Sequence, residues 1–190
     1  DFVRGMVTAY EKEEGEAAKN AIGQILINSK MCAMGHRPLC QDTGSINVFV
    51  KVGLNADLEL VKELEDVINE GVALGYKDPS NTLRYSIVED PAGERRNTKD
   101  NTPAVIHMSV NNSDTIDITV AAKGGGSENK SKFAVLNPSD SIYDWVMENA
   151  RNMGAGWCPP GIIGIGIGGN PEKSMLLAKE SLMGAVDIHE

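Results

Sequence analysis

Two cysteines stand in loop sequences in which a thiolate could bind a soft metal. Cys40 follows a predicted helix that a proline ends, and Cys158 lies in a rigid, proline-containing loop at 156–161. Cys32 lies near a helix end, where a small hydrophobic residue is the ordinary explanation. No two of the three cysteines form a C-x-x-C pair, so their spacing predicts neither a zinc ribbon nor a ferredoxin pattern.

Two glycine clusters could approach a ligand through the main chain. Gly124-Gly125-Gly126 ends a predicted strand and could form a nest of N–H groups for an anion, but it lacks the spacing of a nucleotide P-loop. The segment 164–169 formally contains G-x-G-x-x-G, and Asp187 follows it, as in a dinucleotide-binding fingerprint. Because these glycines alternate with isoleucines, close backbone packing is the preferred interpretation, and a nucleotide-binding α/β module is the alternative.

The first half of the chain contains the patterns of two helices and a strand. Apolar spacing predicts a helix up to about Met31, and alternation over Ile46–Val52 predicts a strand. A second helix is expected from an N-cap at Asp57, with an apolar stripe from Leu60 to Val72. Residues 77–103 have a polar loop composition, which is expected to be either a disordered segment or a binding loop.

The second half predicts two more strands, two helices and a glycine-rich strand. Strands are expected at 105–110 and 115–121, with 111–114 as a hairpin connection. A helix capped by Ser139 or Ser141 should end at Gly154, and the last helix should begin at Asn170-Pro171 and run through Met183. Residues 161–168 read as a short apolar strand, and 184–188 as the start of another. The expected class is α/β (mixed α+β), with helices packed around a mixed sheet that contains a β-hairpin.

Composition excludes several classes of function. The chain has 190 residues and a formal net charge of −9, which disfavours binding to a phosphate backbone. No apolar run approaches the roughly 18–20 residues of a membrane span, and three scattered cysteines do not make a disulfide framework. We therefore expect a cytoplasmic protein that binds neither nucleic acid nor membrane.

Four segments together carry a resemblance to a known family. In chain order they are Pro38-Leu39-Cys40-Gln41-Asp42-Thr43-Gly44, Asn101-Thr102-Pro103-Ala104, Lys123-Gly124-Gly125-Gly126-Ser127-Glu128-Asn129, and Cys158-Pro159-Pro160 followed by Gly164-Ile165-Gly166-Ile167-Gly168-Gly169. This set is similar to the class I, iron–sulfur fumarate hydratases and is also found in the alpha subunit of L(+)-tartrate dehydratase. The similarity spans nearly the whole chain, and the four motifs occur in the family order.

The resemblance implies a [4Fe–4S] cluster with Cys40 and Cys158 as two of its three cysteine ligands. The family's third cysteine belongs downstream of the glycine-rich segment, beyond residue 190, and Cys32 does not match its position. Residues 1–190 are therefore expected to be the N-terminal part of the cluster-binding (alpha) domain of a larger hydro-lyase. Its C-terminal portion is absent, so this piece alone should be inactive.

The resemblance also implies residues that contact substrate. Gln41 and Asp42 match family residues next to the cluster and the substrate, and Asp42 is the expected catalytic residue. Neither is assigned an acid or base role, and the alternative for Asp42 is that it caps a turn or orients a ligand. Arg84 matches an arginine that binds a substrate carboxylate, which suits the paired hydrogen bonds of a guanidinium. Arg95-Arg96 is a rival for that role. Gly125 is the preferred member of its cluster for lying against the substrate.

The implied activity is the reversible addition of water to a C4 dicarboxylate, converting fumarate to L-malate, with L(+)-tartrate dehydration as the alternative. An open iron acting as a Lewis acid would supply several kcal/mol to such a reaction. A C-terminal domain or beta subunit should complete the pocket, within a homodimer or a heterotetramer. The remaining alternatives are the nucleotide-binding module and a catalytically silent scaffold.

Overall fold

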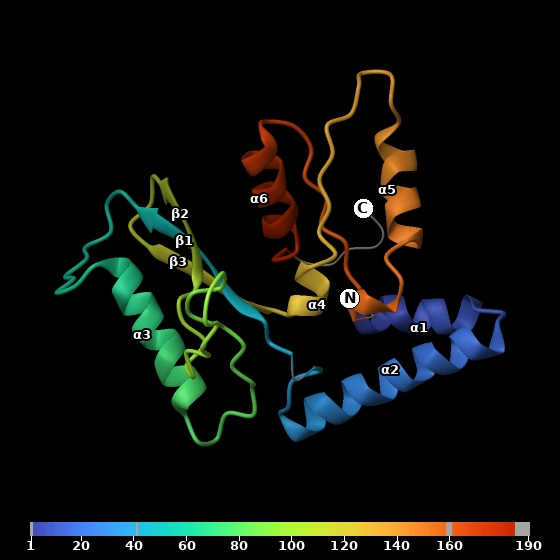
Figure 1. The fold of residues 1–190 in the computed structure, drawn as a ribbon, viewed down its shortest axis with the longest axis horizontal. Helices are drawn as coiled ribbons and strands as arrows, with labels where there is room; N and C mark the ends of the chain where they lie inside the picture. The colour runs from blue at the N-terminus through green and yellow to red at the C-terminus, as the bar shows by residue number, and fades with distance from the viewer. Residues whose placement is uncertain (1, 41, 159–160, 185–190) are drawn as a thin grey trace. The chain divides into compact units, whose positions relative to one another are not determined.

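The computed structural model describes residues 2–40, 42–158 and 161–184 (Figure 1). Its elements in chain order are α1 (Phe2–Lys12), α2 (Glu16–Gly35), β1 (Ser45–Gly53), α3 (Leu64–Lys77), β2 (Val105–Asn111), β3 (Ile116–Lys123), α4 (Gly125–Glu128), α5 (Ile142–Arg151), the 3-10 helix η1 (Ala155–Trp157) and α6 (Pro171–Ser181). The chain divides into two compact units: one contains α1 and α2, and the other runs from Asp42 to Leu182.

The strands of the larger unit form one mixed sheet in the order β2-β1-β3. β1 pairs parallel with β2 and antiparallel with β3, and Val48 lies opposite both Ile106 and Val120. The mixed α/β class predicted from the sequence is confirmed. The predicted β-hairpin is wrong, because β1 lies between the two strands that were expected to pair. Val48 and Val50 are fully buried, and a buried central strand needs backbone partners on both of its edges.

The apolar core of the larger unit lies between one face of the sheet and α3. On this face β1 buries Ile46, Val48 and Val50, and these pack with Tyr76 of α3 and with Ala104. Partly buried apolar residues surround this cluster; from α3 they are Leu64, Ile68 and Val72. The alternation of apolar residues along β1 and the apolar stripe of α3 therefore explain why this helix covers this face of the sheet, which is called the α3 face below.

Three other predicted elements differ from the structure. The first helix is two helices, and the break at Gly15 is closed by an N–H donated to Glu13 Oε1 at 2.8 Å. The third helix begins at Leu64 rather than after Asp57, with Glu63 at its N-cap. Residues 161–168 belong to no strand. Glycines in this segment lie directly against α6, and this close packing explains their spacing better than strand pairing does.

Two helix starts agree with the sequence. The Ser141 hydroxyl accepts a hydrogen bond from the N–H of Asp144 at the start of α5. The Asn170 side chain accepts one from the N–H of Lys173, with Pro171 at the first position of α6. These side chains satisfy N–H groups that a helix start leaves without partners, as predicted. The strand expected from 184 to 188 lies outside the described residues, apart from Gly184.

In the smaller unit α1 packs against α2, and the Lys19 ammonium lies 5.2 Å from the centre of the Tyr10 ring. Neither helix has a buried residue. Cys32, on α2, donates its S–H to the carbonyl of Pro38 at 3.3 Å. This contact gives Cys32 a structural role in joining the helix to the turn that follows it.

Candidate functional site

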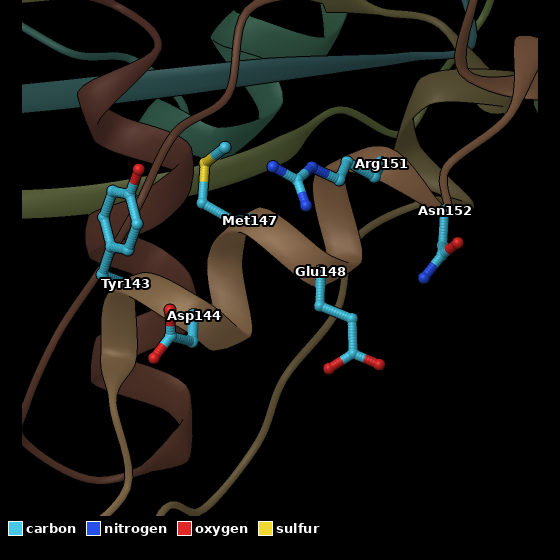
Figure 2. A pocket seen from close by; sticks show the side chains of 6 residues that line it. All are labelled: Tyr143, Asp144, Met147, Glu148, Arg151 and Asn152. Atoms are coloured by element: carbon cyan, nitrogen blue, oxygen red, sulfur yellow. The ribbon is translucent and has the colours of Figure 1, made fainter.

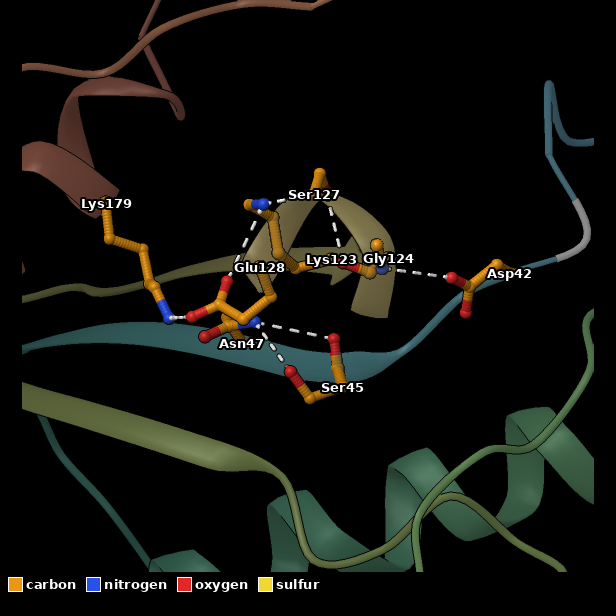
Figure 3. Close-up of polar contacts among 9 residues, drawn as sticks. Asp42, Ser45, Asn47, Lys123, Gly124, Ser127, Glu128 and Lys179 are labelled. Atoms are coloured by element: carbon orange, nitrogen blue, oxygen red, sulfur yellow. Dashed lines mark hydrogen bonds and ion pairs between the residues drawn. The ribbon is translucent and has the colours of Figure 1, made fainter. Parts of the chain in front are cut away.

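The carboxylate of Asp42 is held by main-chain N–H groups from two parts of the sequence. Its Oδ1 accepts a hydrogen bond from the N–H of Gly44 at 3.2 Å. Its Oδ2 accepts one from the N–H of Gly126 at 3.4 Å (Figure 3). The glycine turn, Gly124–Gly126, was expected to hold an anion, and the anion that it holds is the carboxylate of Asp42. These two donors fix the direction of that carboxylate.

Glycine permits close contacts at two positions around Asp42. Gly44 has φ +53°, and a Cβ there would lie 2.0 Å from the carbonyl oxygen of Lys123. A Cβ on Gly126 would lie 3.0 Å from the carbonyl oxygen of Gly156 and 3.1 Å from Sγ of Cys158. At Gly44 both the backbone conformation and the space favour glycine, and at Gly126 a side chain would crowd both neighbours.

Cys158 therefore lies beside the glycine turn. It follows η1, which contacts α4, and its left-handed backbone (φ +63°) places an exposed thiol next to Gly126. The thiol and the Asp42 carboxylate thus both lie near Gly126. Sequence reasoning had placed Cys158 and this turn in separate motifs, and the larger unit brings them together.

Arg84 is connected to Asp42 through the main chain. The two residues form an isolated parallel β-bridge, and the hydroxyl of Thr43 donates a hydrogen bond to the carbonyl of Arg84 at 2.6 Å. Thr43 is buried, whereas the side chain of Arg84 is exposed. The structure thus fixes the backbone of Arg84 beside Asp42 and leaves its guanidinium at the surface, where it could meet a ligand. The rivals Arg95 and Arg96 are also exposed, and Arg96 pairs with Glu94.

Asn101 is a residue of this region that was predicted only as a member of a motif, with no role of its own. Its side chain is fully buried and its φ is +60°. Its Oδ1 accepts from the N–H groups of Ser86 and Ile87, and its Nδ2 donates to the carbonyl of Gly44. A sequence signal did exist, because asparagine tolerates the left-handed conformation and is enriched in turns.

A charged network lies on the opposite side of the glycine turn from Asp42. The carboxylate of Glu128, in α4, accepts a hydrogen bond from Lys179 of α6 at 2.6 Å and lies 3.6 Å from the ammonium of Lys123 (Figure 3). Lys123 also donates to the hydroxyl of Ser127 at 2.8 Å. Burial would raise the pKa of Glu128, but Lys179 and Lys123 outweigh it, so the pKa is lowered. The network anchors the turn to α6.

Cys40 and Gln41 are the remaining predicted site residues. Cys40 is exposed and belongs to the smaller unit, whereas Cys158 belongs to the larger one. Gln41 lies outside the described residues. The joint role of Cys40 and Cys158 therefore stays a prediction. Among residues 2–40, 42–158 and 161–184, no group of three or more histidine, cysteine or acidic side chains could hold a metal ion.

The glycines of the nucleotide-fingerprint segment have a packing role. A Cβ on Gly164 would lie 2.1 Å from the carbonyl oxygen of Ala178, and one on Gly166 would lie 1.9 Å from that of Ser174. Both acceptors belong to α6, so these glycines permit a close approach between the segment and the helix that follows it. Asp187, the acidic residue of the fingerprint, lies outside the described residues.

Two hollows on the surface of the described residues lie away from the predicted site residues. One of about 450 Å³ follows the exposed side of α5, where Tyr143, Met147 and Arg151 line it on successive turns (Figure 2). A second, of about 480 Å³, lies along α3 beside Thr102. Neither contains Asp42, Arg84 or the glycine turn. No helix in the described part of the chain has the length and apolar character needed to cross a membrane.

Comparisons with known proteins give a consistent result. The whole chain, residues 1–190, matches the family described as fumarate hydratase (fumerase). A protein of Methanocaldococcus jannaschii, proposed to be the alpha subunit of an L(+)-tartrate dehydratase, is 35% identical over 189 residues, which cover 96% of this chain and 66% of that protein. The L(+)-tartrate dehydratase subunit alpha of Escherichia coli strain K12 is 30% identical over 183 residues, 90% of this chain and 59% of that subunit. The chain thus spans about three fifths to two thirds of the length of these relatives.

Proposed function

This chain belongs to the fumarate hydratase family, and from that premise we propose that it forms the cluster-binding part of a hydro-lyase that acts on a C4 dicarboxylate. The observation that carries the proposal is the arrangement inside the larger unit. There the Asp42 carboxylate, the main chain of Arg84, the glycine turn and Cys158 lie together, although they come from four separate parts of the sequence. The favoured reaction is the interconversion of fumarate and L-malate.

The cofactor of this proposal is a [4Fe–4S] cluster, held by Cys40, Cys158 and a third cysteine outside this chain. The residues present fit such a group, because the thiol of Cys158 is exposed and the adjacent Gly126 has no side chain to cover it. When bound, the cluster would supply a Lewis-acidic iron for the hydroxyl that is gained or lost.

The side chains of this chain would bind and orient the substrate. Arg84 would bind one carboxylate of the substrate through paired hydrogen bonds. Asp42 would lie against the reacting carbons with its carboxylate direction fixed by Gly44 and Gly126, and Gly125 would lie against the substrate. Fixed orientation of this kind is a major source of rate enhancement.

A second candidate substrate is L(+)-tartrate, because the relatives reported above are named as subunits of its dehydratase. In either case a C-terminal domain or a beta subunit would complete the pocket and supply the group that moves the C–H proton, within a homodimer or a heterotetramer. We place the enzyme in the cytoplasm.

Anaerobic reconstitution of the complete enzyme tests this proposal. Cys40→Ser and Cys158→Ser should each abolish the retention of iron and sulfide and the activity toward fumarate and L(+)-tartrate, since each removes a thiolate ligand. Cys32→Ser is the matched control, because the thiol of Cys32 is engaged with the carbonyl of Pro38. Equal loss of iron in the control would contradict the ligand assignment. Tight NAD binding without iron would favour the nucleotide-binding alternative.

A further inference from the structure

The carboxamide of Asn101 joins two segments that are distant in the sequence. Its Oδ1 accepts hydrogen bonds from the N–H of Ser86 at 2.7 Å and of Ile87 at 3.2 Å. Its Nδ2 donates to the carbonyl of Gly44 at 3.1 Å. The side chain is fully buried, so these main-chain groups have little access to water as a replacement partner.

The two joined segments each carry a residue of the proposed site. Gly44 comes two positions after Asp42 and donates its own N–H to that carboxylate. Ser86 comes two positions after Arg84. The segments of Asp42 and Arg84 also meet at a backbone bridge between these two residues and at the hydrogen bond from Thr43 to the carbonyl of Arg84. Asn101 closes the opposite end of this pair of segments with three more hydrogen bonds.

The backbone around Asn101 is itself fixed. Its left-handed conformation is one that asparagine adopts more readily than most residues. On one side, the Asp100 carboxylate accepts from the hydroxyl of Thr102 at 2.7 Å and pairs with Lys77 of α3 at 2.9 Å. On the other side, the N–H of Ala104 donates to the side chain of Asn69, also on α3. The carboxamide is therefore held from the core of the larger unit and directed toward the site.

We propose that Asn101 is a positioning residue that sets Arg84 relative to Asp42 for binding of the dicarboxylate. It acts through the main chain of the two segments and does not itself touch the substrate. This inference rests on the proposed function for its effect on catalysis, but the positioning itself can be measured without activity. Small displacements of a binding group can lower a rate by a factor of about 100.

The test uses three variants of the complete, reconstituted enzyme. Asn101→Gly removes the carboxamide and keeps a backbone that accepts the left-handed conformation. Asn101→Asp keeps the acceptor for Ser86 and Ile87 and loses the donor to Gly44. Asp90→Gly is the matched control, since Asp90 also has a positive φ of 44° in the same long loop, at an exposed position away from the site.

Two measurements are made on each variant. Amide hydrogen exchange reports the protection of the Ser86 and Ile87 N–H groups, and steady-state kinetics report kcat and KM for fumarate and L(+)-tartrate. Asn101→Gly should lose protection at both amides, raise KM, and lower kcat/KM by roughly 10- to 100-fold. Asn101→Asp should retain most of the protection with a smaller kinetic loss, and Asp90→Gly should match the wild type in both.

The outcomes separate this inference from the proposed function. If the wild-type enzyme acts on neither substrate, the proposed function fails, and hydrogen exchange still decides whether Asn101 holds the segment of Arg84. Unchanged protection and unchanged KM in Asn101→Gly would overturn the inference. The inference would also be overturned if Asn101→Gly lowered only the yield of folded enzyme and left kcat and KM unaltered, because a purely structural role gives that result. If Asn101→Gly does not fold, the KM of Asn101→Asp decides, because this variant loses the hydrogen bond to the carbonyl of Gly44. A raised KM with Ser86 and Ile87 still protected supports the inference, and an unchanged KM overturns it.

Discussion

The two faces of the sheet are covered in different ways. The α3 face buries alternating apolar residues of β1, among them Val48 and Val50, against Tyr76. The opposite face carries Asn47, Phe49 and Lys51 on the same strand, and its neighbours include charged groups of α4 and α6. One strand thus supplies an apolar layer on one side and a polar layer on the other.

The polar layer is only partly satisfied within the described residues. Asn47 is 1% exposed and its Nδ2 donates to Ser45, but its Oδ1 has no hydrogen-bond partner there. The ring of His107 lies 5.0 Å from that of Phe49, and its Nε2 has no partner among these residues either. Lys51 of this face pairs with Glu180 of α6 at 3.7 Å.

One face of the sheet therefore mainly stabilises the fold, and the other mainly positions the segments of the candidate site. Apolar burial is non-directional and scales with area, so the α3 face stabilises the sheet without specifying how the loops at its ends are placed. Hydrogen bonds and ion pairs are directional, and those of the opposite face connect the glycine turn to α6. Substitutions on the two faces should therefore have different consequences, and three of them measure that difference.

The largest effect is expected for Val48→Ala on the α3 face. Val48 is fully buried, so the truncation leaves a cavity and should lower the free energy of unfolding by about 2–3 kcal/mol, measured in urea. Val61→Ala is the matched control, because Val61 is 96% exposed and should change stability by less than about 0.5 kcal/mol. A similar loss of unfolding free energy in the two variants would contradict the conclusion that burial on the α3 face stabilises the sheet.

A smaller effect is expected for Asp100→Asn at the edge of the α3 face. Hydrogen bonds from Thr102, helped by Lys77, hold the pKa of Asp100 at about 2 against burial, which opposes the shift. The folded state therefore favours the charged form, and its stabilisation is present above the unfolded pKa near 3.8 and is lost as the pH falls toward 2. Asp100→Asn should cost roughly 1–2 kcal/mol at neutral pH.

The pH dependence of this effect is the check. Thermal unfolding temperatures of the wild type and Asp100→Asn should converge as the pH is lowered through this range. Asp78→Asn is a matched control, since Asp78 makes the same local contacts with Ser80 but is exposed at the surface. Its effect should be smaller. A constant difference for Asp100→Asn at every pH would show that the charge is not responsible.

The smallest effect is expected for Lys179→Gln on the polar face. Burial lowers the pKa of His107, the charge of Lys179 lowers it further, and Glu180 opposes both. Removing the positive charge should therefore raise the pKa of His107, which an NMR titration of the ring would show. Lys173→Gln, at the start of the same helix, should leave that titration unchanged. A fall in the pKa after Lys179→Gln would contradict the placement of α6 over this face.

Local signals in the sequence were sufficient to predict several helices and strands, but they did not predict which strands pair. The alternation of β1 and the caps at Ser141 and Asn170 depend on a few neighbouring residues, and these predictions are confirmed. The hairpin prediction failed because β1, which separates the two strands, comes more than fifty residues earlier in the chain. The prediction of a strand at 161–168 failed because its glycines pack against a helix. The alternation of glycine and isoleucine alone does not distinguish such packing from a strand.

The candidate site was predicted as residue types rather than as an arrangement. Cys158, Arg84 and Gly125 were named, but their proximity to Asp42 depends on long-range contacts through the main chain. Asn101 was missed as an individual residue because its role arises from burial and from partners 14 to 57 positions away. Such partners leave no periodic pattern in a single sequence.

The hydrogen bonds of Asp42 have a consequence for any reaction at this site. Gly44 directly precedes β1, and Gly126 belongs to α4, which begins two residues after β3 ends at Lys123, so one carboxylate connects segments beside the adjoining ends of two antiparallel strands. A displacement of Asp42 would therefore act on both strand ends together through main-chain hydrogen bonds, instead of remaining within a single loop.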